Sequence, residues 1–186
     1  MESINKPQLE DDSTDSLPHL IEHRVPWLTL GLIGGVVGTL ISSRFETLLS
    51  AHIELVYFIP VIVYMSDAVG TQTETIYIRN LAKKQGNFLT YLLKESLLGL
   101  ALGALFGFLL GAVALIWFKS FDTALTVGLA MWITVAIAPI MAVVVPMFLQ
   151  KERTDPALGA GPFTTVLQDL TSLLIYFFIA SLILFR

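Results

Sequence analysis

The sequence predicts an all-α polytopic membrane protein with five transmembrane helices. Of its 186 residues, 55% are hydrophobic and only 14% are charged, whereas about a quarter of the residues of a soluble domain are charged. The mean hydropathy is +0.75. Five apolar stretches are each long enough to cross a hydrocarbon layer of about 30 Å, which takes about 20 helical residues.

The first three stretches follow one another with short polar connections. Residues 25–43 carry no charge. Residues 55–78 are interrupted by two acids, Asp67 and Glu74. Residues 96–118 are again uncharged. Each length and composition is typical of one membrane-spanning helix.

The last two stretches contain the helix-breaking residues and a third acid. Residues 123–150 are uncharged and include Pro139 and Pro146, which we expect to kink or end the helix. Residues 156–185 carry a single charge, Asp169, near their middle. Five helices per chain, and ten in a homodimer, are the expected architecture.

The chain divides into a short tail and one transmembrane domain. Residues 1–24 are polar and acidic, and we expect a disordered cytoplasmic tail. They lack the basic start and apolar core of a cleaved signal peptide. Residues 25–186 form the five-helix domain. The absence of cysteine excludes disulfides, thiolate metal sites and cysteine nucleophiles.

Basic residues predict the orientation in the cell (inner) membrane. If the N-terminus is cytoplasmic, eight Lys and Arg residues lie inside and three lie outside. This bias places the N-terminus in the cytoplasm and the C-terminus outside. The inner set is Lys6, Arg24, Arg79, Lys83, Lys84, Lys94, Lys151 and Arg153, and the outer set is Arg44, Lys119 and Arg186.

Glycines at every fourth position predict close helix packing. Spacing of four places them on one helix face, where a neighbouring backbone can approach. This packing is expected within the chain, with a contact between two copies as the alternative. The residues are Gly99, Gly103, Gly107 and Gly111 in the third stretch, with the pairs Gly31/Gly35 and Gly34/Gly38 in the first.

Two polar stripes predict a hydrated path between the second and fifth helices. A carboxylate at the centre of a membrane helix costs about 2.5–3.5 kcal/mol on insertion scales, so such residues are mostly functional. The alternative is a pair of buried acids that neighbouring hydroxyls and amides satisfy. The second helix contributes Asp67, Gly70, Thr71, Gln72 and Glu74, and the fifth contributes Gly161, Thr165, Gln168, Asp169, Ser172 and Tyr176.

The oxygen ligands of these stripes favour hard divalent cations, Mg²⁺ or Ca²⁺. The three histidines, His19, His23 and His52, lie outside the stripes, so a soft-metal site is not expected. Mg²⁺ gives up its water reluctantly, and we expect the path to hold it through its hydration shell. A two-fold axis would bring two copies of Asp169 around one ion. The cation is cargo, and no cofactor is expected.

The segment before the fifth helix, "TDPALGAGPF", predicts a turn and a helix start at Asp155. As the functional alternative, Asp155 lies in a cytoplasmic vestibule and acts as a metal ligand. Gly161 and Pro162 predict a break in the helix that would turn a backbone carbonyl toward the path.

Residues 24–185 resemble the transmembrane domain of the MgtE magnesium transporter family. The resemblance rests on "RVPWLTLGLIGG", "FIPVIVYMSDAVGTQTETIYIRNLA", "KESLLGLALG" and, most specifically, "DPALGAGPFTTVLQDLTSLLIYF". It implies a homodimer with a pore at the interface, in which Asp169 binds the ion together with the backbone carbonyl of Thr165. It also implies a half-size member, since full-length members carry an additional N-terminal domain and a CBS pair.

The chain departs from the family's Gly-Gly-Asn-x-Gly-x-Gln signature in its second helix. Gly70 and Gln72 match, but Asp67 replaces a glycine and Ala68 replaces the asparagine. Gly161 stands where some members have asparagine. The additional acid at Asp67 keeps open a proton- or sodium-coupled exchanger or exporter beside a channel.

The expected function is transport of a divalent cation, most readily Mg²⁺, by a homodimer in a lipid bilayer, with no nucleic-acid partner. Two other classes are weighed against it. An intramembrane aspartyl protease needs paired carboxylates, but the Gly-x-Gly-Asp context is missing around Asp67 and Asp169. A non-transporting membrane subunit would not need two aligned polar stripes. We therefore do not expect an enzyme.

Overall fold

The computed structural model describes residues 16–82, 87–151 and 156–184. Five of the helices in these ranges are long and apolar enough to cross a membrane, and the ranges contain no strand. The predicted all-α polytopic architecture is confirmed. The order is α1 (Leu17–Arg44), α2 (Glu46–Ala51), the 3-10 helix η1 (Ile53–Phe58), α3 (Ile59–Ala82), α4 (Phe88–Phe118), α5 (Phe121–Lys151) and α6 (Pro156–Leu184).

Two helices begin earlier than the apolar stretches indicate. Helix α1 begins at Leu17, inside the segment expected as a disordered tail, with Pro18 in its first turn. Proline is well tolerated there because the first N–H groups of a helix have no intrahelical partner. Helix α4 begins at Phe88, where the side chain of Asn87 accepts a hydrogen bond of 2.9 Å from the backbone N–H of Leu89. Hydropathy detects the long uncharged part of a helix, not the turns that charged residues separate from it.

The prolines of the last two helices do not end them. Helix α5 continues through Pro139 and Pro146, so the expectation that they end it is wrong. Helix α6 runs through Gly161 and Pro162 without the expected break. A proline removes one backbone hydrogen bond, and neighbouring helices compensate for such losses in membrane bundles.

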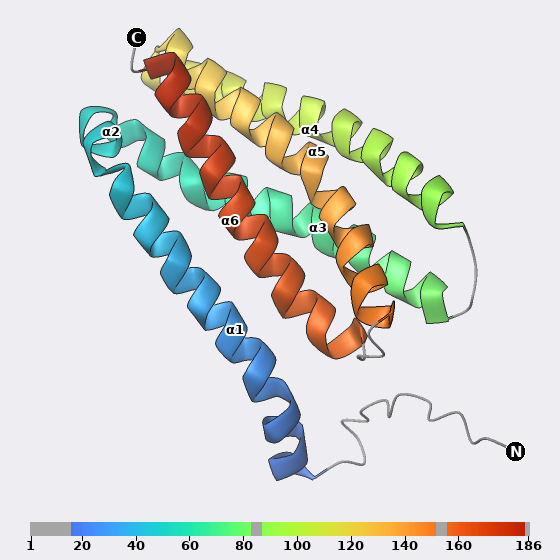
Figure 1. Ribbon diagram of the computed structural model, residues 1–186. Coiled ribbons are helices and arrows are strands. Elements are labelled where there is room, and N and C mark those ends of the chain that lie inside the picture. The colour runs from blue at the N-terminus through green and yellow to red at the C-terminus, as the bar shows by residue number, and fades with distance from the viewer. Residues whose placement is uncertain (1–15, 83–86, 152–155, 185–186) are drawn as a thin grey trace, which may run out of the picture.

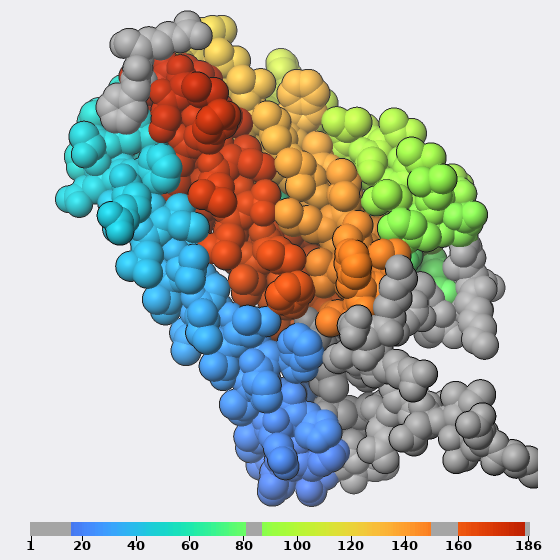
Figure 2. Space-filling model, in the orientation of Figure 1, coloured from blue at the N-terminus to red at the C-terminus, as the bar shows by residue number. Residues whose placement is uncertain are grey.

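Helix α5 is the centre of the bundle. It packs against α3, α4 and α6, and its fully buried side chains include Val127, Met131 and Val135. Figure 1 shows α6 lying between α1 and α5, with α3 crossing behind it and α4 at the far edge. Figure 2 shows the same order as neighbouring bands of side chains from α1 through α6 and α5 to α4.

The four glycines of α4 pack against the backbone of α5. A Cβ atom added at Gly103 would lie 2.5 Å from the carbonyl oxygen of Trp132, and one added at Gly111 would lie 3.1 Å from that of Ala124. Gly99 and Gly107 similarly face backbone oxygens of α5. The glycines, which are four residues apart in α4, thus face backbone oxygens that are also four residues apart in α5. Helix α4 is therefore held mainly through contact between the two backbones.

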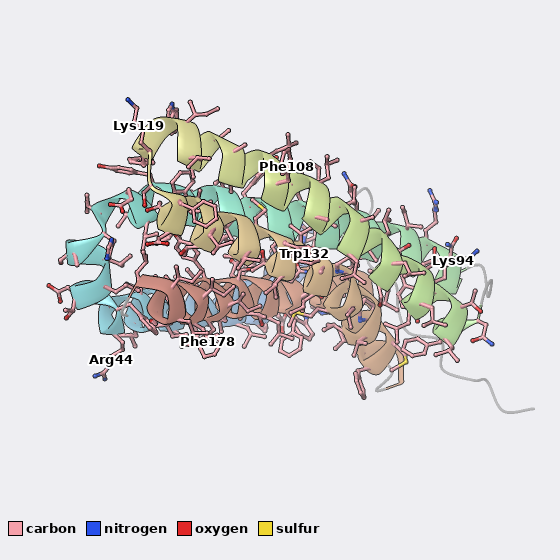
Figure 3. The ribbon with its side chains drawn as sticks, turned by 90° about the horizontal axis from the view of Figure 1, so that it is seen from above. Arg44, Lys94, Phe108, Lys119, Trp132 and Phe178 are labelled. Carbon is pink, nitrogen blue, oxygen red and sulfur yellow. The ribbon has the colours of Figure 1, made fainter. Side chains whose placement is uncertain are left out.

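Hydrogen bonds at one end of the bundle hold the segment between α1 and α3, which contains α2 and η1. The hydroxyl of Tyr176 donates a hydrogen bond of 2.7 Å to the backbone oxygen of Leu55 in η1. Thr123 donates one of 3.2 Å to the carboxylate of Glu54. Figure 3 shows Arg44 and Lys119 at this end and Lys94 at the other, with Phe108, Trp132 and Phe178 between them. Charged residues thus mark the two ends of the apolar bundle.

Candidate functional site

The centre of the candidate site is a contact between the two predicted polar helices. The Thr165 hydroxyl of α6 donates a hydrogen bond of 3.0 Å to Oδ1 of Asp67 on α3. Asp169 lies one turn further along α6, and Asp67 is close enough to act on it electrostatically. Both aspartates are half-buried. The structure therefore brings together Asp67, Thr165 and Asp169.

These three residues line a pocket of about 590 Å³ between α1, α3 and α6. Its wall combines the two carboxylates and several hydroxyls with glycine and aliphatic side chains. The lining residues are Gly34, Gly35, Gly38, Thr39 and Ser42 of α1, Ile59, Pro60, Val63, Tyr64 and Asp67 of α3, and Thr165, Asp169, Leu170 and Leu173 of α6.

The pocket is large enough for a hydrated cation. Water occupies about 30 Å³ per molecule in the liquid, so six waters need about 180 Å³. The carboxylates offer hard oxygen acceptors to such an ion. Among the residues that the structure describes, however, no group of three or more His, Asp or Glu side chains is placed to hold a metal ion. Within the described residues, the acidic side chains of the pocket wall are Asp67 and Asp169.

Gln168 lies behind the pocket. Its side chain is only 2% exposed, and its Nε2 donates a hydrogen bond of 3.1 Å to the backbone oxygen of Ala138 in α5. The same amide lies against Gly70 of α3, where an added Cβ atom would collide with Nε2. Gln168 therefore joins α3, α5 and α6 directly beside Asp169, and it does not belong to the pocket wall.

The other acid of α3, Glu74, lies in the interior of the bundle. It is 7% exposed and is not a pocket-lining residue. The side chain that its carboxylate faces is Thr164 of α6, the neighbour of the threonine that binds Asp67. The two acids of α3 thus have different surroundings, one beside an open pocket and one enclosed.

The remaining predicted residues are spread around this centre. Thr71 and Gln72 are exposed on the surface of α3. Ser172 of α6 is buried at 1% exposure. Gly161 and Pro162 are half-buried in the first turns of α6. Asp155, the expected ligand at the inner mouth, lies outside the described residues.

Reasoning from the sequence missed the contribution of α1 to the pocket. Gly34 and Gly38 are buried against Val166, Leu170 and Leu173 of α6, so α1 approaches α6 closely. This approach places Thr39 and Ser42 in the pocket wall. The four-residue spacing of Gly34, Gly38 and Ser42 was the available signal, since it forms a face of small residues on one side of the helix.

Comparison with known proteins gives a consistent result. The family model MgtE, described as a divalent cation transporter, matches residues 59–179. A protein from Enterococcus faecalis named magnesium transporter MgtE is 36% identical over 162 residues, which is 86% of this chain and 36% of that protein. Proteins of the same name from Bacillus subtilis and Thermus thermophilus are 34% and 33% identical over 85% and 87% of this chain, and again 36% of each relative is covered.

The chain therefore spans about a third of the length of the relatives it matches. The matched family region begins at the first residue of α3 and ends within the last two turns of α6. It includes Asp67, Thr165 and Asp169, so the pocket acids and their connecting hydrogen bond fall within the region of similarity.

Proposed function

Because the chain belongs to the MgtE family of divalent cation transporters, we propose that it moves a divalent cation, most readily Mg²⁺, across a membrane along a path that includes Asp67, Thr165 and Asp169. The observation that carries the proposal is the pocket itself. It places two carboxylates on membrane-spanning helices, in a space large enough for a hydrated ion. Membership of a transporter family also argues against the aspartyl protease.

The ligand chemistry supports Mg²⁺ as cargo. Carboxylate and hydroxyl oxygens suit hard cations, and a pocket wider than a bare ion suits a cation that keeps most of its waters. The Thr165 hydroxyl occupies one carboxylate oxygen of Asp67 and leaves the second free. Asp169 supplies the central charge in this proposal.

A homodimer completes the site in this proposal. Thr71, Gln72 and Thr75 are exposed on α3, although this part of the helix belongs to a membrane-spanning segment. Polar side chains in a bilayer generally face protein or water, not lipid. A second copy placed against this face would cover them and bring two further aspartates to the same path.

The charge distribution supports a cytoplasmic N-terminus. Lys94, near the start of α4, lies at the end of the bundle opposite Arg44 and Lys119 (Figure 3). Arg79 lies in the last turn of α3, at the end of the bundle where α4 begins (Figure 1). The positive-inside rule then places this end in the cytoplasm. In this orientation Gly161 and Pro162, in the first turns of α6, lie near the inner mouth of the path.

The direct test is cation flux into liposomes that contain the purified full chain and a Mg²⁺-sensitive dye. We expect Mg²⁺ entry with the wild-type protein and a loss of at least about tenfold for Asp169→Asn, since removing one carboxylate charge costs 1.4 kcal/mol or more in ion binding. Asp122→Asn is the matched control, because Asp122 is an exposed acid in the first turn of α5. Flux of the Asp169→Asn protein at the wild-type rate would remove Asp169 from the mechanism. Absence of flux from the wild-type protein would favour a non-transporting subunit.

A further inference from the structure

The pocket between α1, α3 and α6 extends from the two aspartates toward one end of the bundle. On α3 its lining runs from Asp67 back to Ile59, which is about 12 Å along the helix axis. On α1 the lining reaches Ser42, close to the end of the helix at Arg44. Figure 3 shows Arg44 at the end of the bundle opposite Lys94. The pocket therefore leads from the acids toward the Arg44 end.

Two hydroxyl groups of α1 line this part of the pocket, and each donates its hydrogen to its own helix. Oγ1 of Thr39 donates a hydrogen bond of 3.0 Å to the backbone oxygen of Gly35, and Oγ of Ser42 donates one of 3.0 Å to that of Gly38. A hydroxyl has one hydrogen and two lone pairs, so each oxygen can still accept a hydrogen bond but no longer donates one. Thr39 and Ser42 therefore present acceptors to the pocket.

The other polar side chains of the pocket wall have nearly the same character. Thr165 donates its hydroxyl hydrogen to Asp67, and the ionised carboxylates of Asp67 and Asp169 are acceptors only. Tyr64 is the lining residue whose phenol can still donate, and its side chain is 67% exposed. Apart from this exposed phenol, the side chains of the wall accept hydrogen bonds without donating any into the pocket.

Such a wall suits a cation that is surrounded by water. The waters of a hydrated cation turn their oxygens toward the ion and their hydrogens outward, and Mg²⁺ usually keeps several of its waters in a protein site. A hydrogen bond through such a water is nearly as favourable as a direct one. An anion would instead require donors. The hydroxyls of α1 therefore match the outer surface of the same hydrated ion that the carboxylates attract.

The alternative is that these hydroxyls serve the helix alone, since serine and threonine often bond to the backbone one turn earlier in membrane helices. Ser43 provides the comparison within α1. It donates a hydrogen bond of 2.8 Å to the backbone oxygen of Leu40, but it does not line this pocket. Thr39 and Ser42 differ from Ser43 in sharing a pocket with two carboxylates.

Resting on the proposed function, we propose that α1 forms a third side of the cation path. Thr39 and Ser42 accept hydrogen bonds from the water shell of the divalent cation between Asp169 and the Arg44 end of the bundle. They position the hydrated ion, while the aspartates supply the charge. With the N-terminus in the cytoplasm, this part of the pocket is the outer half of the path.

The first test measures whether Mg²⁺ protects these positions from a thiol reagent. The chain contains no cysteine, so Thr39→Cys and Ser42→Cys each introduce a unique thiol into the full-length protein in membranes. We expect both to react with a positively charged thiosulfonate reagent, which reaches thiols through water. Mg²⁺ at about four times its half-saturating concentration should slow the reaction about fivefold, because about a fifth of the sites are then empty.

Two matched controls lie beside these positions on α1. Ser43→Cys is exposed near the end of the helix and outside the pocket, and we expect it to react at a rate that Mg²⁺ does not change. Leu40, the neighbour of Thr39, is 60% exposed and also lies outside the pocket. We expect Leu40→Cys to react much more slowly than Thr39→Cys, because an apolar exposed position on this helix faces lipid.

The second test measures Mg²⁺ flux into liposomes. Thr39→Val and Ser42→Ala each remove one acceptor, and the Mg²⁺ concentration at half-maximal flux should rise about fivefold in each, the equivalent of one hydrogen bond. Thr39→Ser retains the oxygen and should remain close to the wild type. Ser43→Ala is the control outside the pocket and should leave the half-maximal concentration unchanged.

Two results would overturn the inference. One is a reaction rate at Thr39→Cys and Ser42→Cys that Mg²⁺ does not change, and the other is a wild-type half-maximal concentration in both Thr39→Val and Ser42→Ala. Either result leaves the proposed function intact if the wild-type protein moves Mg²⁺. If the wild-type protein moves no divalent cation, the proposed function fails by itself, and protection by Mg²⁺ alone then decides whether α1 contacts the bound ion.

Discussion

Thr165 of α6 donates a hydrogen bond of 3.0 Å to Asp67 of α3 and thereby fixes the distance between the helices that carry the two pocket acids. Without this hydroxyl, Asp67 would be free to adopt other rotamers, and its carboxylate would be less well placed beside Asp169. The hydrogen bond thus contributes to the site without adding charge.

Replacing Thr165 by valine keeps the shape of the side chain and removes the donor. A hydrogen bond of this kind contributes about 1 kcal/mol, which corresponds to about fivefold in an equilibrium constant. We expect the Mg²⁺ concentration at half-maximal flux to rise about fivefold in Thr165→Val. Thr165→Ser retains the hydroxyl and should remain close to the wild type. A wild-type response in Thr165→Val together with a weakened response in Thr165→Ser would show that the methyl group of Thr165, and not its hydroxyl, is required.

Gly70→Ala should destabilise the packing of Gln168 next to the pocket. The added Cβ atom would collide with Nε2 of Gln168, which is bonded to Ala138 and cannot retreat freely. Overpacking of this kind costs about 1–3 kcal/mol, which lowers the Tm of a chain of this size by about 2–12 °C. Thermal unfolding in detergent measures the change. Gly35→Ala is the control because nothing lies within 4 Å of a Cβ atom at that position, and an equal loss there would refute the steric explanation.

The glycines of α4 predict a graded loss of stability. At Gly103 an added Cβ atom would lie 2.5 Å from a backbone oxygen of α5, and at Gly111 the corresponding distance is 3.1 Å. The backbone of α5 is buried at the centre of the bundle and moves less easily than a side chain. We therefore expect Gly103→Ala to lower the Tm by several degrees, about 1–3 kcal/mol of overpacking, and Gly111→Ala to lower it less. The reverse order would show that the two helices separate locally at little cost.

The number and type of the long helices follow from hydropathy alone, because the membrane requires about 20 apolar residues per helix. The periodicity of the polar residues also placed Asp67, Thr165 and Asp169 on helix faces that lie together in the structure. The first residue of each helix was harder to predict from the sequence. Leu17 and Phe88 begin helices ahead of charged residues that separate these first turns from the long apolar stretches.

Contacts between distant helices could not be read from one sequence. Nothing in the sequence indicates that Gln168 bonds to Ala138, since the partner is a backbone oxygen that every residue possesses. The different environments of Asp67 and Glu74 were equally hidden, because both lie on the same stripe of α3 and only the position of α6 distinguishes them. Whether Pro139 ends its helix was equally hidden, because the cost of a proline within a helix depends on the packing around it.

The exposed polar face of α3 predicts where two copies meet. The chain contains no cysteine, so a single substitution introduces a unique cross-linking position without any background change. Gln72 is exposed on α3 and faces the second copy in the proposed dimer. We expect Gln72→Cys to form a disulfide-linked or bis-maleimide-linked dimer in native membranes, visible as a doubled mass on a denaturing gel.

Phe108→Cys is the matched control for this experiment. Phe108 is 74% exposed on α4, at the edge of the bundle opposite α1 (Figures 1 and 3), and an apolar side chain there is compatible with contact to lipid. Cross-linking at Phe108 but not at Gln72 would place the interface on α4 and leave the polar face of α3 without a partner. In that case the acids of one chain alone would have to serve the ion, and the shared path between two copies would be excluded.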